Sequence, residues 1–196
     1  MEEETSKLTF DPTTHTYTID GKEVLSVTQV LQLIFPTKYD GVDPAVLKRA
    51  SERGTFIHEA IEVWERLGYD TEECEELQNW KILKFENELE VEENEIPVII
   101  TLGDYKIAGR LDVVLSKDGK LGLGDFKTTY NLDLEYLKLQ LNLYRIGYEQ
   151  TYSKKIDFIA GIHLRKEKKK YVELPIEEEQ TKERIINALK ENEKLC

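Results

Sequence analysis

The chain has 196 residues, which is enough for one hydrophobic core and short for two domains. Hydrophobic residues make up 40% and charged residues 34%, a globular composition that excludes low-complexity chains. It contains no apolar run of about 18 residues and no signal-peptide pattern, so we expect a cytoplasmic protein that neither spans nor binds a membrane. Two cysteines, Cys74 and Cys196, form no C-x-x-C motif and no disulfide framework.

The net charge of −12 is concentrated in one segment. Residues 51–100 hold 15 acidic and 4 basic residues, whereas the rest of the chain holds 24 and 23. Surfaces outside this segment are nearly neutral and can meet phosphate. The total charge nevertheless gives no strong long-range attraction to nucleic acid.

The first 42 residues predict a β-hairpin followed by a short helix. Two apolar stretches flank Asp20-Gly21, a dipeptide that favours a type I′ turn because both residues tolerate positive φ. Ser26 is a good N-cap for an amphipathic helix that ends before Pro36. We expect His15, in the hairpin, to be an ordinary surface residue.

Two helices are predicted next. Asp43-Pro44 starts a helix whose apolar residues repeat every three or four positions up to about residue 67. His58 lies at the edge of this apolar stripe, where a histidine is usually structural. Residues 71–94 predict a second, acidic helix whose charges form a solvated face or repel misplaced nucleic acid. A strand over residues 95–102 follows.

The sequence is organised around a second Asp-Gly hairpin, residues 109–128. If Asp118-Gly119 is the two-residue turn, Asp112 faces Asp125 on the neighbouring strand. Facing Cβ atoms lie about 5 Å apart and like charges there are destabilising, so a divalent cation between the acids resolves the conflict. Lys127 shares the face of Asp125 and can orient an attacking water. The alternative is a hairpin whose acids face solvent.

The C-terminal part predicts a buried helix, a hairpin and a last helix. Apolar side chains on nearly every face of residues 133–150 indicate a buried helix. Gln140 and Tyr144 share one of its faces, and a hydrogen-bonded core pair is the simple interpretation. Strands at 156–164 and 171–174 enclose a run with five basic residues in six, and a helix follows at about 176–194. Such runs are usually solvated.

An acid on one strand followed by Asp-x-Lys on the next resembles the PD-(D/E)XK nuclease superfamily. Asp112 and Asp125-Phe126-Lys127 stand in the motif positions. Two further motifs, Gly54-x-x-x-His58 and Gln140-x-x-x-Tyr144, occur in the order of the RecB-like, phage-type branch. The pattern H-x-Y-x-x-D-G-x-x-x-x-S-V-T-x-V-L at residues 15–31 resembles the same branch. The resemblance covers roughly residues 8 to 165.

The resemblance implies a restriction-endonuclease-like α/β fold. Its αβββαβ core has a mixed central sheet flanked by helices, and the N-terminal β-hairpin is added to it. We expect one nuclease domain over residues 1–196. Its parts are an N-terminal hairpin and helix (1–42), a catalytic core (43–175) and a C-terminal helix (176–196).

The resemblance also implies metal-dependent hydrolysis of DNA phosphodiester bonds with one or two Mg²⁺ or Mn²⁺ ions. The expected metal-binding groups are His58, Asp112, Asp125 and the carbonyl of Phe126. Asp112 and Asp125 are then catalytic together with Lys127, which positions the water. Glu95 stays open between an outer-shell acid and a strand-edge solubiliser. Some relatives hold a four-cysteine iron–sulfur cluster, but two cysteines cannot supply one, so we expect none.

DNA is the expected partner. The resemblance implies that Gln140 and Tyr144 contact DNA near the active site. We add Arg110, which the hairpin register places opposite Lys127. The best phosphate-binding residues in the basic run are Lys168, Lys169 and Lys170.

The best interpretation is an exonuclease of phage-type recombination, repair or DNA end processing, acting alone, as a homo-oligomer or with a recombination partner protein. Three alternatives remain. They are an endonuclease or structure-specific resolvase, a non-catalytic relative that binds DNA or a partner, and a hydrolase whose substrate is not a nucleic acid.

Overall fold

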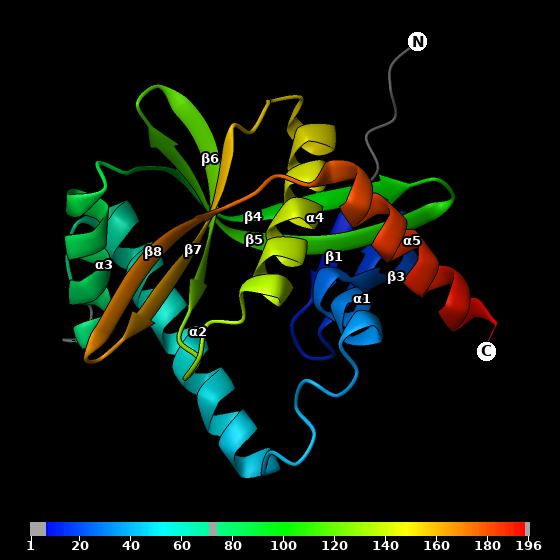
Figure 1. Ribbon diagram of the computed structural model, residues 1–196, viewed down its shortest axis with the longest axis horizontal. Coiled ribbons are helices and arrows are strands. Elements are labelled where there is room, and N and C mark those ends of the chain that lie inside the picture. The colour runs from blue at the N-terminus through cyan, green and yellow to red at the C-terminus, as the bar shows by residue number, and fades with distance from the viewer. Residues whose placement is uncertain (1–6, 71–73, 195–196) are drawn as a thin grey trace.

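The computed structural model describes residues 7–70 and 74–194, and over these residues an eight-stranded mixed sheet carries helices on both faces (Figure 1). The strands are β1 (Leu8–Asp11), β2 (Thr16–Ile19), β3 (Lys22–Ser26), β4 (Glu90–Leu102), β5 (Tyr105–Lys117), β6 (Lys120–Lys127), β7 (Phe158–Arg165) and β8 (Lys168–Leu174). The helices are α1 (Val27–Ile34), α2 (Pro44–Leu67), α3 (Glu75–Glu86), α4 (Leu134–Tyr152) and α5 (Glu178–Glu193). The expected α/β fold with its restriction-endonuclease-like core and N-terminal hairpin is confirmed.

The long strand β5 changes partner along one of its edges. The sheet order is β1-β2-β3-β5-β6-β7-β8, and β4 pairs with β5 over nearly the full length of the other edge. On the first edge β5 pairs with β3 at Ile107 and Ala108, in parallel, and with β6 from Val113 onward, antiparallel. Residues 109–112 lie between these two pairings. The sheet therefore forks at this point, and we call this place the β5 fork.

Two hydrophobic cores pack against opposite faces of the sheet. One joins α1, α4 and α5 to β4 and β5, and the other joins α2 and α3 to β6 and β7 (Figure 1). The neighbours Val113 and Val114 show the alternation of a strand, because Val113 enters the second core and Val114 the first. Both side chains are fully buried. The sheet is thus held from both sides next to the β5 fork.

Local turn and cap signals gave correct predictions. The turn residues Asp20-Gly21 and Asp118-Gly119 all have positive φ, and Val114 pairs with Leu123 as the predicted register requires. The side chain of Ser26 accepts a hydrogen bond from Gln29 N in a capping box that starts α1. Asp43 caps α2, which ends before Gly68 in the left-handed conformation.

The acidic segment differs from the predicted helix 71–94. Residues 71–73 lie outside the described part of the chain, and α3 ends at Glu86. Glu88 then adopts a φ of 53°, Leu89 enters the core, and β4 begins at Glu90. Pairing of β4 along β5 therefore overrides the helix propensity of the glutamates, which is a weak preference that tertiary contacts often outweigh.

Side chains at the end of α4 cover the outer edge of β4. Thr151 Oγ1 lies 3.2 Å from Ile99 N and 3.3 Å from Ile99 O. Gln150 accepts from Thr101 N and donates to Thr101 O, and the hydroxyl of Tyr152 donates to Pro97 O. Backbone groups of this edge between residues 97 and 101 are thereby paired without another strand.

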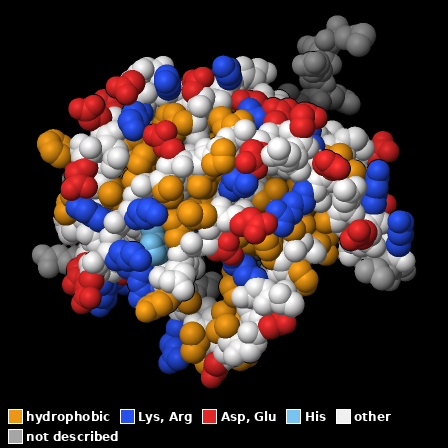
Figure 2. Space-filling model, viewed as in Figure 1, with side chains coloured by type: hydrophobic (Ala, Val, Ile, Leu, Met, Phe, Trp, Pro, Cys, Tyr) orange, Lys and Arg blue, Asp and Glu red, His pale blue; other side chains and the backbone are white. Residues whose placement is uncertain are grey.

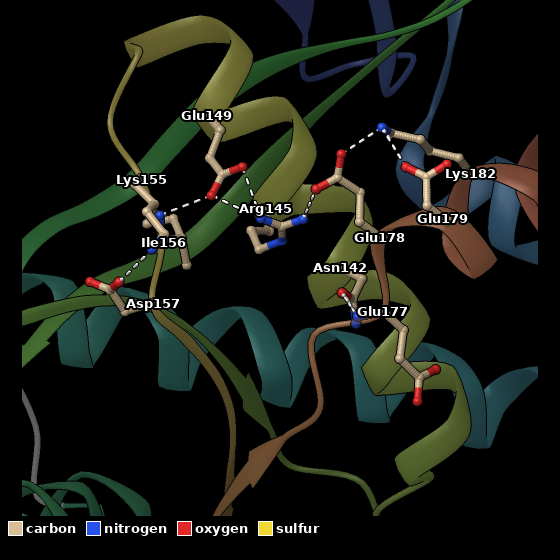
Figure 3. A network of polar contacts seen from close by, with 10 residues as sticks. All are labelled: Asn142, Arg145, Glu149, Lys155, Ile156, Asp157, Glu177, Glu178, Glu179 and Lys182. Atoms are coloured by element: carbon tan, nitrogen blue, oxygen red, sulfur yellow. Dashed lines mark hydrogen bonds and ion pairs between the residues drawn. The ribbon is translucent and has the colours of Figure 1, made fainter.

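Asn142 of α4 fixes the linker that leads into α5. This fully buried amide donates to Lys138 O and Pro175 O at 3.0 Å. It also accepts from Glu177 N at 2.7 Å (Figure 3). Buried backbone groups that lose such a partner pay their full desolvation cost. One side chain therefore satisfies three backbone groups.

Arg145, one turn further along α4, joins three parts of the chain. Its guanidinium donates to both carboxylate oxygens of Glu149 at 2.9 Å and to Glu178 of α5 (Figure 3). Glu149 also accepts from Ile156 N at 2.9 Å, just before β7.

Within residues 7–70 and 74–194, no helix is long and apolar enough to cross a membrane.

We expect Asn142→Ala to lower the free energy of unfolding by about 2–4 kcal/mol, because it leaves buried backbone groups without partners. Urea denaturation measures this. The matched control is Asn187→Ala on the exposed side of α5, which we expect to change stability by no more than about 0.5 kcal/mol. Equal effects of the two variants would show that the Asn142 contacts contribute nothing.

Candidate active site

The β5 fork brings a histidine and two acids together. Ligand atoms of His58, Glu95 and Asp112 all lie within 4.8 Å of one another. His58 Nδ1 is 3.6 Å from Asp112 Oδ1 and 3.9 Å from Glu95 Oε1. Carboxylate oxygens and an imidazole nitrogen are ligand atoms that divalent cations bind, so this group fits a metal ion.

The other nitrogen of His58 shows how the ring is oriented. His58 Nε2 lies 3.2 Å from the carbonyl oxygen of Phe126. The carbonyl only accepts, so Nε2 donates to it and Nδ1 is the nitrogen that faces the two acids. Metal-binding histidines are usually fixed in this way by a carbonyl or carboxylate. The predicted proximity of His58 to the catalytic hairpin is therefore present, with the Phe126 carbonyl at its second nitrogen.

Asp112 is held by the neighbouring strand. Its Oδ2 accepts from Phe126 N at 2.7 Å, so its carboxylate continues the β5–β6 contact where the described pairing ends at Val113 and Gly124. Its other oxygen faces His58. The predicted register thus brings Asp112 to the start of the Asp-x-Lys segment.

Glu95 completes the cluster, although the sequence left its role open. Asn94 pairs with Val113 and Ile96 with Leu111, so Glu95 stands opposite Asp112. Its φ of 53° interrupts the pairing at this position. The signal was present in the sequence, because a two-residue Gly103-Asp104 turn places residue 95 opposite residue 112.

Two acids of the site, Glu95 and Asp125, have pKa values above their ordinary range. Burial raises the pKa of Glu95 to about 7, repulsion from Asp112 adds to this, and Arg110 opposes it from 3.2 Å. Burial also raises the pKa of Asp125 to about 6, against the attraction of Lys127. Both shifts indicate a place where additional positive charge is stabilising.

Lys127 is a partly buried cation beside the buried Asp125. Its Nζ lies 2.5 Å from Asp125 Oδ2. Burial by itself lowers the pKa of Lys127, but attraction to Asp125 and Asp112 outweighs it and raises the pKa above its ordinary value. Lys127 therefore stays protonated at neutral pH. It acts as a hydrogen-bond donor and positive charge, and not as a base.

A cleft of about 480 Å³ opens over these groups. Most of the predicted site residues line it, namely Arg110, Asp112, Asp125, Lys127, Gln140 and Tyr144. Gly109 also lines it, and a Cβ there would lie 2.8 Å from Tyr144 Cε1, so only glycine admits this ring against β5. Among the described residues, the buried Gln140 Oε1 has no hydrogen-bond partner. Burial and the two acids raise the pKa of Tyr144 well above its ordinary value.

Arg110 does not lie opposite Lys127 as predicted. The described β5–β6 pairing ends at Val113 and Gly124, so residues 109–112 have no paired partner in β6. Arg110 pairs with Pro97 of β4, on the other edge of β5. Its guanidinium contacts Glu95 and the ring of Phe10. Arg110 still lines the cleft, on the side of the N-terminal hairpin.

The basic run lies partly within strands and away from the cleft. β8 begins at Lys168 instead of residue 171, so Lys168 and Lys170 are exposed and Lys169 reaches Glu86 at 3.1 Å. Lysine and arginine side chains gather on the side of the molecule where β7 and β8 lie, with acidic side chains next to them (Figure 2). The β7–β8 pairing extends up to Arg165 and Lys168.

A family model described as the PD-(D/E)XK nuclease superfamily matches residues 65–195, which is two thirds of the chain. The chain therefore belongs to this superfamily. The matched stretch contains Glu95, Asp112, Asp125 and Lys127, and it begins after His58. Nucleases of this superfamily use divalent metals, and the cluster at the β5 fork is a suitable place for one.

The structure is similar to a solved structure titled "Crystal structure of SSO0001". The TM-score is 0.50 at 16% sequence identity, and the match covers 88% of this chain and 77% of that chain. At this identity the likeness shows a shared fold. No curated protein matches the sequence.

We expect Glu95→Gln to stabilise the metal-free protein at pH 8 by about 1–3 kcal/mol, because it removes the charge of a partly buried carboxylate that Asp112 also repels. The pKa of Glu95 is near 7 in the folded state and near 4.5 as a free side chain. Its destabilising charge is thus absent below about pH 4.5 and complete above about pH 7, so the gain grows between these values.

Urea unfolding in EDTA at pH 5 and pH 8 measures this gain. Glu90→Gln, exposed on the same strand, is the control. With Mn²⁺ present, Glu95→Gln should instead lose stability relative to the wild type, because a ligand charge is missing. A gain that does not depend on pH would rule out the repulsion.

Proposed function

We propose that this chain is a metal-dependent deoxyribonuclease that works as an exonuclease. Membership of the superfamily supplies the reaction class, a metal-dependent nuclease. The observation that carries the proposal is the convergence at the β5 fork, where the cluster of His58, Glu95 and Asp112 lies beside the buried Asp125 and its ion-pair partner Lys127.

The proposed ligands of Mg²⁺ or Mn²⁺ are His58 through Nδ1, Asp112 and Asp125, and the structure adds Glu95 to this set. The carbonyl of Phe126 lies at the other nitrogen of His58, so we assign it to a second ion. Such an ion lowers the pKa of a bound water and neutralises charge that develops on the phosphate. Lys127 keeps its proton, so its role is to hold the attacking water or a phosphate oxygen by donation. The Tyr144 phenol likewise keeps its proton, and it and the Gln140 amide are placed to donate to the DNA strand.

Three hollows in succession support a path for DNA. The cleft over the acids shares Lys127 and Gln140 with a second hollow of about 660 Å³. The second shares Tyr130 with a third, which Arg165 and Lys168 also line. The guanidinium of Arg165 stacks on the Tyr130 ring at 5.0 Å. The turn between β7 and β8, which carries Arg165 and Lys168 and which we call the basic tip, therefore lies at the end of the row of hollows that begins at the acids.

The exonuclease assignment rests on the N-terminal pattern at residues 15–31, part of which lines the cleft through His15, Tyr17 and the start of α1. Work in phage-type recombination, repair or end processing, with 5′-phosphate products, belongs to the same proposal. Its test is digestion of linear and closed-circular DNA with Mg²⁺. Cleavage of both forms at equal rates would show an endonuclease instead.

We expect Asp112→Asn to abolish DNA cleavage and to weaken Mn²⁺ binding at least about tenfold. Asparagine keeps an oxygen that can accept from Phe126 N, so the fold stays intact while the ligand charge is lost. Calorimetric Mn²⁺ titration and digestion of linear DNA measure the two effects. The control is Asp104→Ala in the exposed β4–β5 turn, which should match the wild type. Full activity of Asp112→Asn would refute the site.

We expect the double variant Lys168→Ala/Lys170→Ala to flatten the salt dependence of DNA binding. Each lost phosphate contact reduces the slope of log K against log salt by about 0.7–0.9. The control replaces Lys155 at the opposite end of β7 and Lys190 on α5, both exposed. Binding is measured by fluorescence anisotropy with Ca²⁺ at several salt concentrations. An unchanged slope would show that Lys168 and Lys170 do not contact the phosphates of DNA.

A further inference from the structure

One wall of the active-site cleft is aromatic and comes from the N-terminal hairpin. Phe10 of β1 and Tyr17 of β2 pack with ring centroids 4.6 Å apart and an interplanar angle of 37°. His15 packs edge-on against Phe10 at 5.9 Å, and the guanidinium of Arg110 lies over the Phe10 ring at 5.4 Å. All four line the same cleft as Asp112, Asp125 and Lys127.

Core packing does not account for this wall. Ile19 of the same hairpin is the residue that enters the protein interior, with 3% of its surface exposed. Phe10 and Tyr17 are only half-buried, and His15 is exposed. Aromatic faces that remain open beside a catalytic site are available for a planar ligand.

The wall is connected to the acids through Arg110. Its Nε contacts Glu95 at 3.2 Å while its guanidinium covers Phe10. Burial raises the pKa of Tyr17, and the positive charge of Arg110 limits this rise, so Arg110 interacts with Tyr17 as well as with Phe10. A base placed on the wall would therefore have its phosphate close to the Glu95–Asp112 group.

We propose that Phe10, His15, Tyr17 and Arg110 form a stacking platform for a nucleobase of the strand being cut. The proposal rests on the proposed nuclease function and names its substrate class, DNA whose bases are unpaired next to the scissile phosphate. Bases inside a duplex have both faces covered by their neighbours, so only single-stranded or frayed DNA offers a base to the platform. Every base has a π face, so the platform accepts any sequence.

The charge of the protein favours this mode of binding. A net charge of −12 gives little long-range attraction to DNA, so affinity must come from short-range contacts. Stacking on aromatic side chains supplies such contacts and adds cation–π attraction from arginine. Its contribution does not depend on releasing counterions.

The test compares a single-stranded oligonucleotide with the same strand carrying abasic sites, with Ca²⁺ replacing Mg²⁺. We expect Phe10→Leu to weaken binding of the intact strand by about 5- to 100-fold and to leave binding of the abasic strand unchanged. Phe10→Tyr keeps the ring, and Phe85→Leu removes an exposed ring on α3, so both should bind as the wild type does. Quenching of 2-aminopurine fluorescence in the bound strand should disappear in Phe10→Leu.

Equal loss for intact and abasic strands, or no loss for either, would overturn the platform. If Phe10→Leu does not fold, as judged by thermal melting, His15→Ala provides the same comparison from an exposed position. The nuclease proposal is tested separately by Mg²⁺-dependent cleavage of the intact strand by the wild type. Cleavage without base discrimination refutes only the platform, and discrimination without cleavage refutes only the nuclease.

Discussion

Asp112 stands where β5 has left β3 and has not yet paired fully with β6, and its carboxylate fills that gap in the backbone contacts. One oxygen replaces a ladder acceptor for Phe126 N, and the other faces His58. A carboxylate in this position joins the folding of the hairpin to the assembly of the metal cluster. The arrangement of Glu95, Asp125 and Lys127 follows from the same fork, because each belongs to a strand that meets β5 there.

The fork concentrates negative charge in a half-buried place, and the surrounding structure must support it. Val113 and Val114 anchor β5 in two cores on opposite faces, and α4 presents Gln140 and Tyr144 to the cleft. The far side of α4 is fixed by Asn142 to the linker before α5. Rigid contacts on one side of this helix thus hold functional groups on the other, as a preorganised site requires.

Features set by local chemistry were predictable from the sequence. The Asp118-Gly119 turn set the register of β5 and β6 up to Gly124, next to Asp125, and Asp43 and Gly68 marked both ends of α2. Features that depend on pairing between strands far apart in the sequence could not be predicted. The start of β4 at Glu90 and the position of Arg110 depend on how β5 pairs on each edge. Glu95 was within reach, because counting back from the Gly103-Asp104 turn pairs it with Asp112, but its positive φ had no signal in the sequence.

The covering of β4 by Gln150, Thr151 and Tyr152 has a consequence for self-association. A strand edge with open amides and carbonyls is a template onto which a second chain can add a strand. Here those groups along residues 97–101 are already satisfied by the end of α4. Addition of a second chain along residues 97–101 is therefore disfavoured. The outer strands of the described sheet are β1, which carries Phe10 of the cleft, and β8, which carries the basic run, so a neighbour on either strand would lie against the proposed DNA path.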